Sequence, residues 1–230
     1  MIARLITIAF VLFLSFGVPL LSILTARQEG LEQAPRRLLY LSAVSSQWFL
    51  AGLALLLAWG GFLPFRGFRL LSLGAFAFWT MALTLVSLAG LLVVLWLERL
   101  GWWPEESRLV YLLLPQTRAE TWWCVLLVAP TAGFCEEFLY RGCLLPQLSA
   151  WFHSVGWGWA ASSVAFGAAH TYQGVNGIVR AALLGAWLAL PMVRFGSLLP
   201  SIAAHFLIDA LALAWIGPAT LPARPEQKEA

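Results

Sequence analysis

Charged residues are scarce in this sequence of 230 residues. Asp, Glu, Lys and Arg together account for 11% of the chain, whereas hydrophobic residues account for 61%. A water-soluble domain of this length carries about 25% charged residues. So little charge cannot cover a water-exposed surface. The composition therefore excludes the soluble globular class and predicts a membrane protein.

Cysteine is also rare, and the basic residues form no patch. The three cysteines, Cys124, Cys135 and Cys143, are an odd number without CxxC spacing, which argues against a disulfide framework and a thiolate metal site. We interpret them as packing residues. The net charge of +3 comes from basic residues scattered through short loops, as in juxtamembrane segments. This scatter argues against nucleic acid as a partner.

Long apolar runs are abundant, and they set the fold class. Seven apolar segments, separated by charged or Pro/Gly-rich breaks, are predicted to span the membrane; they are residues 5–24, 39–63, 70–97, 121–145, 157–170, 178–193 and 198–216. The third is long, and the count becomes eight if it is two segments. Because open sheet edges do not occur in lipid, the predicted fold is an all-α polytopic transmembrane helical bundle.

The chain is predicted to form a single domain. Residues 1–216 make the transmembrane bundle, and residues 217–230 are a polar, proline-containing tail that we expect to be disordered. Residues 98–120 are the most polar internal stretch, and we expect an interfacial helix there around residues 107–114. Thirteen tryptophans fit an aromatic belt at the membrane surface.

Ionisable residues inside apolar segments are the candidates for function. Each costs about 2.5–3.5 kcal/mol at the centre of a membrane helix on insertion scales. Six such residues lie in or at the end of predicted spans: Glu136, Glu137, Arg141, His170, His205 and Asp209. His153, by contrast, lies in a predicted loop without an acidic neighbour, and we interpret it as structural.

The adjacent pair Glu136 and Glu137 is the most unusual of these features. Glu137 and Arg141 are i, i+4 neighbours, so Arg141 can hold Glu137 ionised and oriented on one helix face. Glu136 points about 100° away, toward another helix or a cavity, where it can serve as a general base. The alternative is a purely structural Glu137–Arg141 pair, but that reading does not explain Glu136.

The two remaining groups have the same four-residue spacing. His205 and Asp209 are i, i+4 neighbours, so the carboxylate can orient one ring nitrogen of the imidazole. His170 follows Phe166 by four residues on one helix face. A lone histidine at a helix end is more often a solvated interface residue than a catalyst. The apolar segments also contain three acidic residues, a second histidine and an arginine, and this combination favours a functional role for His170.

Taken in order, the three motifs resemble a known family. Glu136-Glu137-x-x-x-Arg141, Phe166-x-x-x-His170 and His205-x-x-x-Asp209 are similar to the motifs of the CPBP (CAAX protease and bacteriocin-processing, or Abi) intramembrane proteases. The third motif of that family is usually His-x-x-x-Asn or Asp, so Asp209 is within its range. The resemblance covers residues 121–216, and the first three predicted spans carry no signature.

The resemblance implies an intramembrane endopeptidase whose helices surround a water-filled cavity. Carried over to this chain, Glu136 with His170 would activate the attacking water, and His205 with Asp209 would stabilise the oxyanion. Glu137, Arg141 and Phe166 would shape the site. The expected partners are the lipid bilayer and a membrane-anchored or lipid-modified protein or peptide substrate. By analogy, we expect the protein in a bacterial inner (plasma) membrane.

The resemblance leaves open whether the protease uses a metal ion. The family has been described both as metalloproteases and as glutamate-type enzymes with a metal-free water. If the enzyme is metal-dependent, Glu136, His170 and His205 would be the ligands of zinc or a similar divalent ion. The chain has no His-Glu-x-x-His motif. We favour the metal-free alternative, because adjacent glutamates face different directions and cannot easily ligate one ion together.

Two other functions compete with a protease. One is a non-catalytic immunity or scaffolding membrane protein of the same fold, which would not need both His170 and His205. The other is a proton-coupled transporter that uses the carboxylate pair as a relay. The sequence has no internal inverted repeat, which counts against the transporter.

Overall fold

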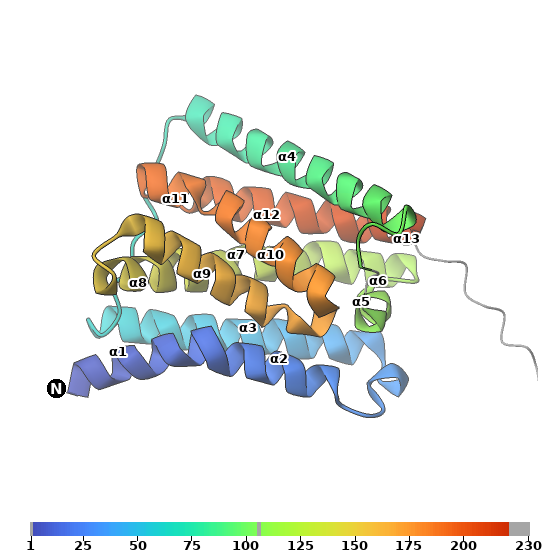
Figure 1. Ribbon diagram of the computed structural model, residues 1–230, viewed down its shortest axis with the longest axis horizontal. Helices are drawn as coiled ribbons and strands as arrows, with labels where there is room; N and C mark the ends of the chain where they lie inside the picture. Colours follow the sequence, from blue (N-terminus) through green and yellow to red (C-terminus); the bar gives the residue numbers. More distant parts are fainter. Residues whose placement is uncertain (1, 105–106, 221–230) are drawn as a thin grey trace, which may run out of the picture.

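The protein is a bundle of helices, as the composition predicts. The computed structural model describes residues 2–104 and 107–220, and the helices in these two ranges lie alongside one another (Figure 1). The only β-type pairing within these ranges is an isolated bridge between Phe68 and Ser197. The predicted all-α polytopic bundle is confirmed.

The number of membrane spans differs from the prediction. Within the described residues, six helical stretches are long and apolar enough to cross a membrane: Ile2–Ala26, Arg36–Trp59, Leu73–Arg99, Arg118–Trp151, Thr171–Phe195 and Leu199–Ile216. The segment predicted at 157–170 forms helix α9 (Val155–Ala169), which has 15 residues. Its length of about 22 Å falls short of a hydrocarbon core of about 30 Å. The described residues therefore hold six candidate spans, one fewer than the seven apolar segments of the sequence.

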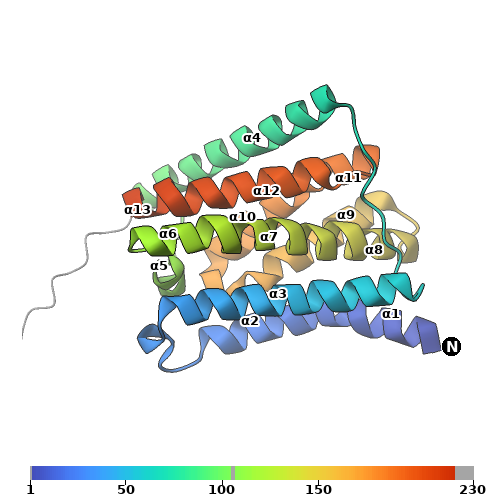
Figure 2. The ribbon, with the colours of Figure 1, turned by 180° about the vertical axis from the view of Figure 1, so that it is seen from behind.

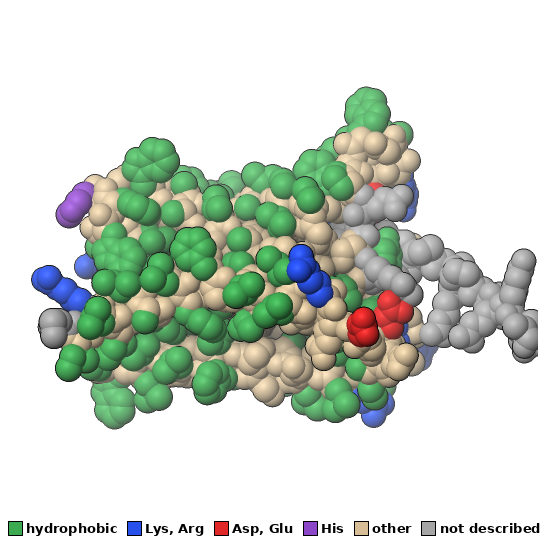
Figure 3. Space-filling view, turned by 60° about the horizontal axis from the view of Figure 1, so that its bottom comes forward, with side chains coloured by type: hydrophobic (Ala, Val, Ile, Leu, Met, Phe, Trp, Pro, Cys, Tyr) green, Lys and Arg blue, Asp and Glu red, His purple; other side chains and the backbone are tan. Residues whose placement is uncertain are grey.

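The outer surface has the character of a membrane protein. Figure 3 shows one face, on which hydrophobic side chains are spread over much of the surface while charged side chains are few. Large side chains such as Phe16, Phe49 and Trp59 are 69%, 71% and 87% exposed. An apolar exterior of this kind is stable only against lipid. The protein is an integral membrane protein.

The first two spans lie along one side of the bundle, at the bottom of Figure 1, and the third lies along the opposite side, at the top. Helices α1 (Ile2–Leu12) and α2 (Val18–Ala26) are joined by the π-helical turn Phe13–Gly17, and α3 (Arg36–Trp59) returns beside them. Helix α4 (Leu73–Arg99) lies at the outer edge, beside α12 (Leu199–Leu211) (Figures 1 and 2). The expected interfacial helix is α5 (Arg108–Leu113).

The stretch Arg118–Trp151 is continuous but not uniformly α-helical. Helices α6 (Arg118–Trp123), α7 (Ala129–Glu136) and α8 (Leu145–Trp151) are separated by two π-helical turns, which are Cys124–Val128 and Glu137–Leu144. Each turn precedes a helix with proline at its start, and proline cannot donate the helical hydrogen bond. The carbonyl of Gly142, four residues before Pro146, instead accepts from the backbone N–H of Arg66 at 3.3 Å.

The last helices pack closely on this stretch. Helix α10 (Gly174–Leu188) packs along α9, α11 (Leu190–Phe195) follows it, and α12 crosses α7. At Gly133 of α7, an added Cβ would lie 2.9 Å from the backbone nitrogen of Phe206, so the two backbones almost touch. Of the tail predicted to be disordered, Gly217–Thr220 forms the short helix α13, and 221–230 lie outside the described residues.

Candidate active site

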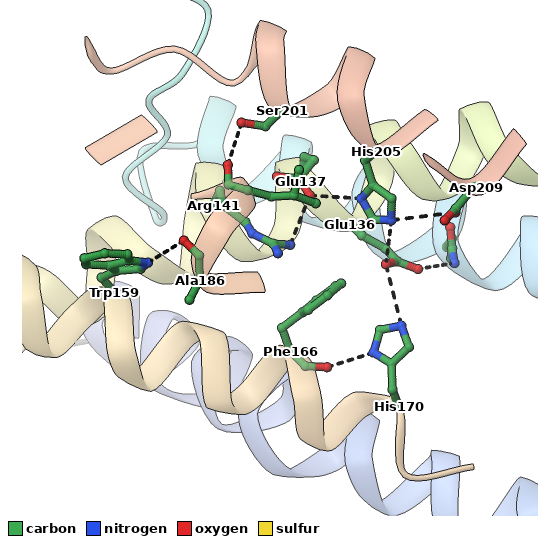
Figure 4. A network of polar contacts seen from close by, with 12 residues as sticks. Glu136, Glu137, Arg141, Trp159, Phe166, His170, Ala186, Ser201, His205 and Asp209 are labelled. Carbon is green, nitrogen blue, oxygen red and sulfur yellow. Dashed lines mark hydrogen bonds and ion pairs between the residues drawn. The ribbon is translucent and has the colours of Figure 1, made fainter. Parts of the chain in front are cut away.

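Three helices bring the predicted residues together in the middle of the bundle. Glu136 is the last residue of α7, and Glu137 and Arg141 lie in the π-helical turn that follows. His170 caps the C-terminal end of α9, and His205 and Asp209 project from α12 (Figure 4). The structure therefore places the residues of all three motifs in one cluster.

Glu137 is the buried centre of this cluster. Its side chain is fully buried, and its Oε1 lies 3.2 Å from Arg141 Nη1, which confirms the predicted i, i+4 pair. The same oxygen lies 2.9 Å from Nδ1 of His205 on another helix. Glu137 therefore fixes the imidazole ring as well as the guanidinium.

The contact of His205 with Asp209 differs from the expectation. Asp209 was expected to orient a ring nitrogen of His205, but its Oδ2 lies 3.6 Å from Nε2, beyond hydrogen-bond distance. Glu137 performs this orientation instead, at Nδ1. Glu137 and His205 are 68 positions apart in the sequence and lie on different helices, which explains why spacing along one helix did not reveal this contact.

Phe166 packs between the charged groups. The Arg141 guanidinium carbon lies 4.1 Å from the centre of its ring, a cation–π contact. The same ring lies 4.7 Å from the ring of His170, centre to centre, and 6.3 Å from that of His205. Phe166 thus packs against three site side chains and helps to fix their relative positions.

Glu136 and the two histidines face one another across short gaps. The Oε2 atom of Glu136 lies 3.9 Å from Nε2 of His170 and 3.9 Å from Nε2 of His205. Nδ1 of His170 lies 2.8 Å from the carbonyl oxygen of Phe166. When Nδ1 donates its proton to that carbonyl, Nε2 carries the lone pair and presents it to Glu136.

The facing atoms line a cavity of about 840 Å³. Its walls include Glu136, Phe166, His170, His205 and Asp209, whereas the buried Glu137 and Arg141 are not part of them. The adjacent glutamates are thus divided between the cavity and the protein interior. This division matches the different roles that their directions on the helix suggest.

The cavity extends to the lipid-facing surface between α4 and α10. Val86 of α4 and Leu183 of α10 line it, and they are 52% and 65% exposed. Gly90 of α4 also lines it, and a Cβ added there would meet no atom within 4 Å. The cavity therefore reaches an exposed apolar part of the surface.

Two polar residues near the site were missed by the sequence reasoning. Gln47 of α3 donates from Nε2 to Oε1 of Glu136 at 2.8 Å. Tyr172 lines the cavity, and its ring is stacked against that of His170 at 6.1 Å between centres. The signal for Gln47 was available, because it is a polar residue within an apolar span. His153 lies exposed in a loop with φ of 51° and does not line the cavity.

Comparison with known proteins gives one match. Residues 118–211 match the family described as type II CAAX prenyl endopeptidase Rce1-like. This chain carries an Rce1-like segment. The resemblance to the CAAX protease family, predicted from the three motifs, is confirmed, and it supports an intramembrane protease in general. Neither the curated proteins nor the solved structures gave a match to the chain.

The Rce1-like segment includes every residue of the three motifs, and it runs from the start of α6 to the end of α12. Helices α1 to α5 lie outside it. Gln47, which touches Glu136, is therefore supplied by a part of the chain that the family match does not cover.

The donor atoms of the Rce1-like segment provide a test of the metal alternative. Two imidazole nitrogens and two carboxylates have the chemistry of zinc ligands. Within the described ranges, no three His, Cys, Asp or Glu side chains form a ready-made metal-binding group. Ligands at about 2.0–2.2 Å from zinc lie closer together than the 3.9 Å between Glu136 and either histidine.

Proposed function

We propose that this protein hydrolyses a peptide bond in a lipid-modified or otherwise membrane-associated protein or peptide, with a water molecule that Glu136 and His170 activate. The observation that carries the proposal is the pair of 3.9 Å gaps between Glu136 Oε2 and the two histidine nitrogens. Each gap is too long for a direct hydrogen bond. It suits one bridging water molecule, at about 2.8 Å from each of the three atoms.

The chemistry of the first step follows from this arrangement. The water donates one proton toward Glu136, which acts as general base, while His170 Nε2 accepts the other hydrogen and orients the oxygen. The oxygen then attacks the scissile carbonyl carbon. The proton held by Glu136 can later pass to the departing amine.

His205 and Asp209 support the second requirement of peptide hydrolysis. Negative charge develops on the carbonyl oxygen and must be met by hydrogen-bond donors. Nδ1 of His205 donates to Glu137, so Nε2 faces the cavity, and in the imidazolium form of His205 the proton on Nε2 can be donated to the oxyanion. Asp209, 3.6 Å away, supplies a second donor when its carboxyl carries a proton.

The substrate class is inferred from the cavity opening and from the matched family. The family description names prenyl endopeptidases, and a prenyl group is an apolar chain suited to lipid. The opening beside Val86 and Leu183 allows such a chain to stay in the bilayer while the attached peptide reaches Glu136. The location that we propose is a bacterial inner membrane.

The proposed mechanism works without a metal ion, because the positioned carboxylate and imidazole activate water by themselves. Retained cleavage after exhaustive dialysis against a chelator, with no stoichiometric zinc in the active protein, would support the metal-free mechanism. Loss of cleavage that added zinc restores would replace it with the metal-dependent alternative and its ligands Glu136, His170 and His205.

The direct test uses the full chain, purified and reconstituted in liposomes. A peptide with a prenylated cysteine near its C-terminus is compared with the same peptide without the lipid, and the products are identified by mass spectrometry. We expect cleavage by the wild type, faster for the prenylated peptide, and loss of cleavage in His205→Ala. Equal cleavage by His205→Ala contradicts the proposed site. Absence of cleavage by a correctly folded wild type, in either peptide, favours the scaffold or transporter alternative.

A further inference from the structure

We propose that Gln47, on α3, is a positioning residue that holds the Glu136 carboxylate in its working orientation. The inference rests on the proposed function, because it concerns the general base of that reaction. It goes beyond the matched segment, since Gln47 lies in the part of the chain that precedes residues 118–211. The side chain donates from Nε2 to Glu136 Oε1 at 2.8 Å across 89 residues of sequence.

This hydrogen bond determines which carboxylate oxygen faces the histidines. Among the described residues, Gln47 is the only hydrogen-bond donor to the Glu136 side chain, because both histidine contacts of Oε2 are 3.9 Å long. With Oε1 engaged on one side, Oε2 is directed to Nε2 of His170 and His205. A glutamate side chain without this contact would populate several rotamers.

The chemistry of an amide suits this task. An amide NH₂ is a neutral donor, so it orients the carboxylate without neutralising it. Arg141, by contrast, provides a full positive charge to Glu137, which does not line the cavity. A cation of that kind beside Glu136 would weaken it as a base. The neighbouring glutamates thus have partners that match their separate roles.

The surroundings of Gln47 indicate a function other than helix packing. Its Oε1 atom is buried and has no hydrogen-bond partner within the described residues, which lowers stability. An apolar side chain would avoid this cost in the middle of a membrane helix. Docking of α3 on α7 is already provided next to it by Trp48, which donates to Thr131 Oγ1 at 3.0 Å and stacks on Phe134.

Gln47→Met is the test variant, because methionine keeps the length and shape of the side chain but cannot hold a carboxylate. We expect kcat to fall about tenfold or more, with KM and the melting temperature close to those of the wild type. Thr131→Val is the matched control: it removes one hydrogen bond between the same two helices without touching Glu136. We expect its kcat to be unchanged. A purely structural role for Gln47 predicts the same small effect in both variants.

A second variant covers the case in which Gln47→Met does not fold. Gln47→Glu keeps a polar side chain of equal size but faces Glu136 with another carboxylate, and we expect a loss of kcat at least as large. If Glu136→Gln is inactive while the Gln47 variants match Thr131→Val, the inference about Gln47 is wrong and the proposed function stands. If Glu136→Gln cleaves like the wild type, the proposed function itself is wrong.

Discussion

At the scale of single residues, the adjacent glutamates show how much a sequence can reveal. Their different directions on the helix and the Glu137–Arg141 pair were predictable from spacing. The contacts of Glu137 with His205 and of Glu136 with Gln47 were not predictable, because the partners are 68 and 89 positions apart in the sequence. Local periodicity contains no information about which helices meet.

Glu137 is expected to support the structure as well as the site. Glu137→Ala leaves Arg141 buried without its carboxylate, so we expect a loss of about 3–5 kcal/mol of unfolding free energy and loss of cleavage. The double variant Glu137→Leu with Arg141→Met removes both charges and should recover most of the stability. It should remain poorly active, because His205 Nδ1 still lacks its acceptor. Thermal unfolding in detergent and cleavage in liposomes measure the two effects, and wild-type activity in the double variant would contradict them.

Asp209 provides a test of the oxyanion assignment. An ionised carboxylate can only accept hydrogen bonds, whereas an asparagine amide always donates. We therefore expect Asp209→Asn to keep a rate within about tenfold of the wild type, because one neutral donor replaces another. Asp209→Leu should reduce kcat by about 10²–10³, the effect of removing an oxyanion donor. An inactive Asp209→Asn, with normal folding, would instead assign Asp209 a role as a base.

At the scale of helices, the sequence predicted most elements but not their irregularities. The apolar runs predicted the six long helices, because length and hydropathy are local properties. Helix α5 lies where the polar stretch 98–120 predicted a helix. The apolar runs also predicted α9, which forms at the expected place, but its 15 residues make it shorter than the six candidate spans. The π-helical turns on either side of α7 were not predicted, although Pro130 and Pro146 are their physical cause.

The close approach of α7 and α12 is expected to be necessary for the site. Gly133→Ala places a Cβ 2.9 Å from the backbone of Phe206, and backbone cannot move aside as a side chain can. The helices would separate, and with them Glu136 and His205, so we expect lower cleavage and a lower melting temperature. Gly52→Ala on α3 is the control, since a Cβ there meets nothing within 4 Å and helix propensity even improves. Equal activities of the two variants would argue against this packing.

The opening between α4 and α10 can be tested by filling it. Gly90→Trp adds a large side chain where a Cβ meets no neighbour, so the fold should tolerate it. We expect KM for a lipid-modified peptide to increase at least several-fold with little change in kcat, because entry is obstructed and the reacting groups are untouched. Steady-state kinetics in liposomes, with Gly52→Ala as the control, provides the measurement. An unchanged KM would mean that the substrate enters by another route.

At the scale of the whole molecule, the motifs and the matched family account for only part of the site. The Rce1-like segment contains Glu136, both histidines and Asp209, and these were predictable because each motif is a short pattern on one helix. The preceding helices complete the site: α3 supplies Gln47, and α4 forms a wall of the cavity. No motif in residues 1–117 indicated these contributions, since they depend on how the helices assemble.

The central claim, that Glu136 activates the hydrolytic water, is tested most directly by the single-turnover cleavage rate of Glu136→Gln in liposomes. Glutamine keeps the size of the side chain but cannot accept the proton. We expect the rate to fall by about 10²–10⁴, the usual contribution of a general base, while the melting temperature stays close to that of the wild type. A folded Glu136→Gln protein that cleaves at the wild-type rate would contradict the account.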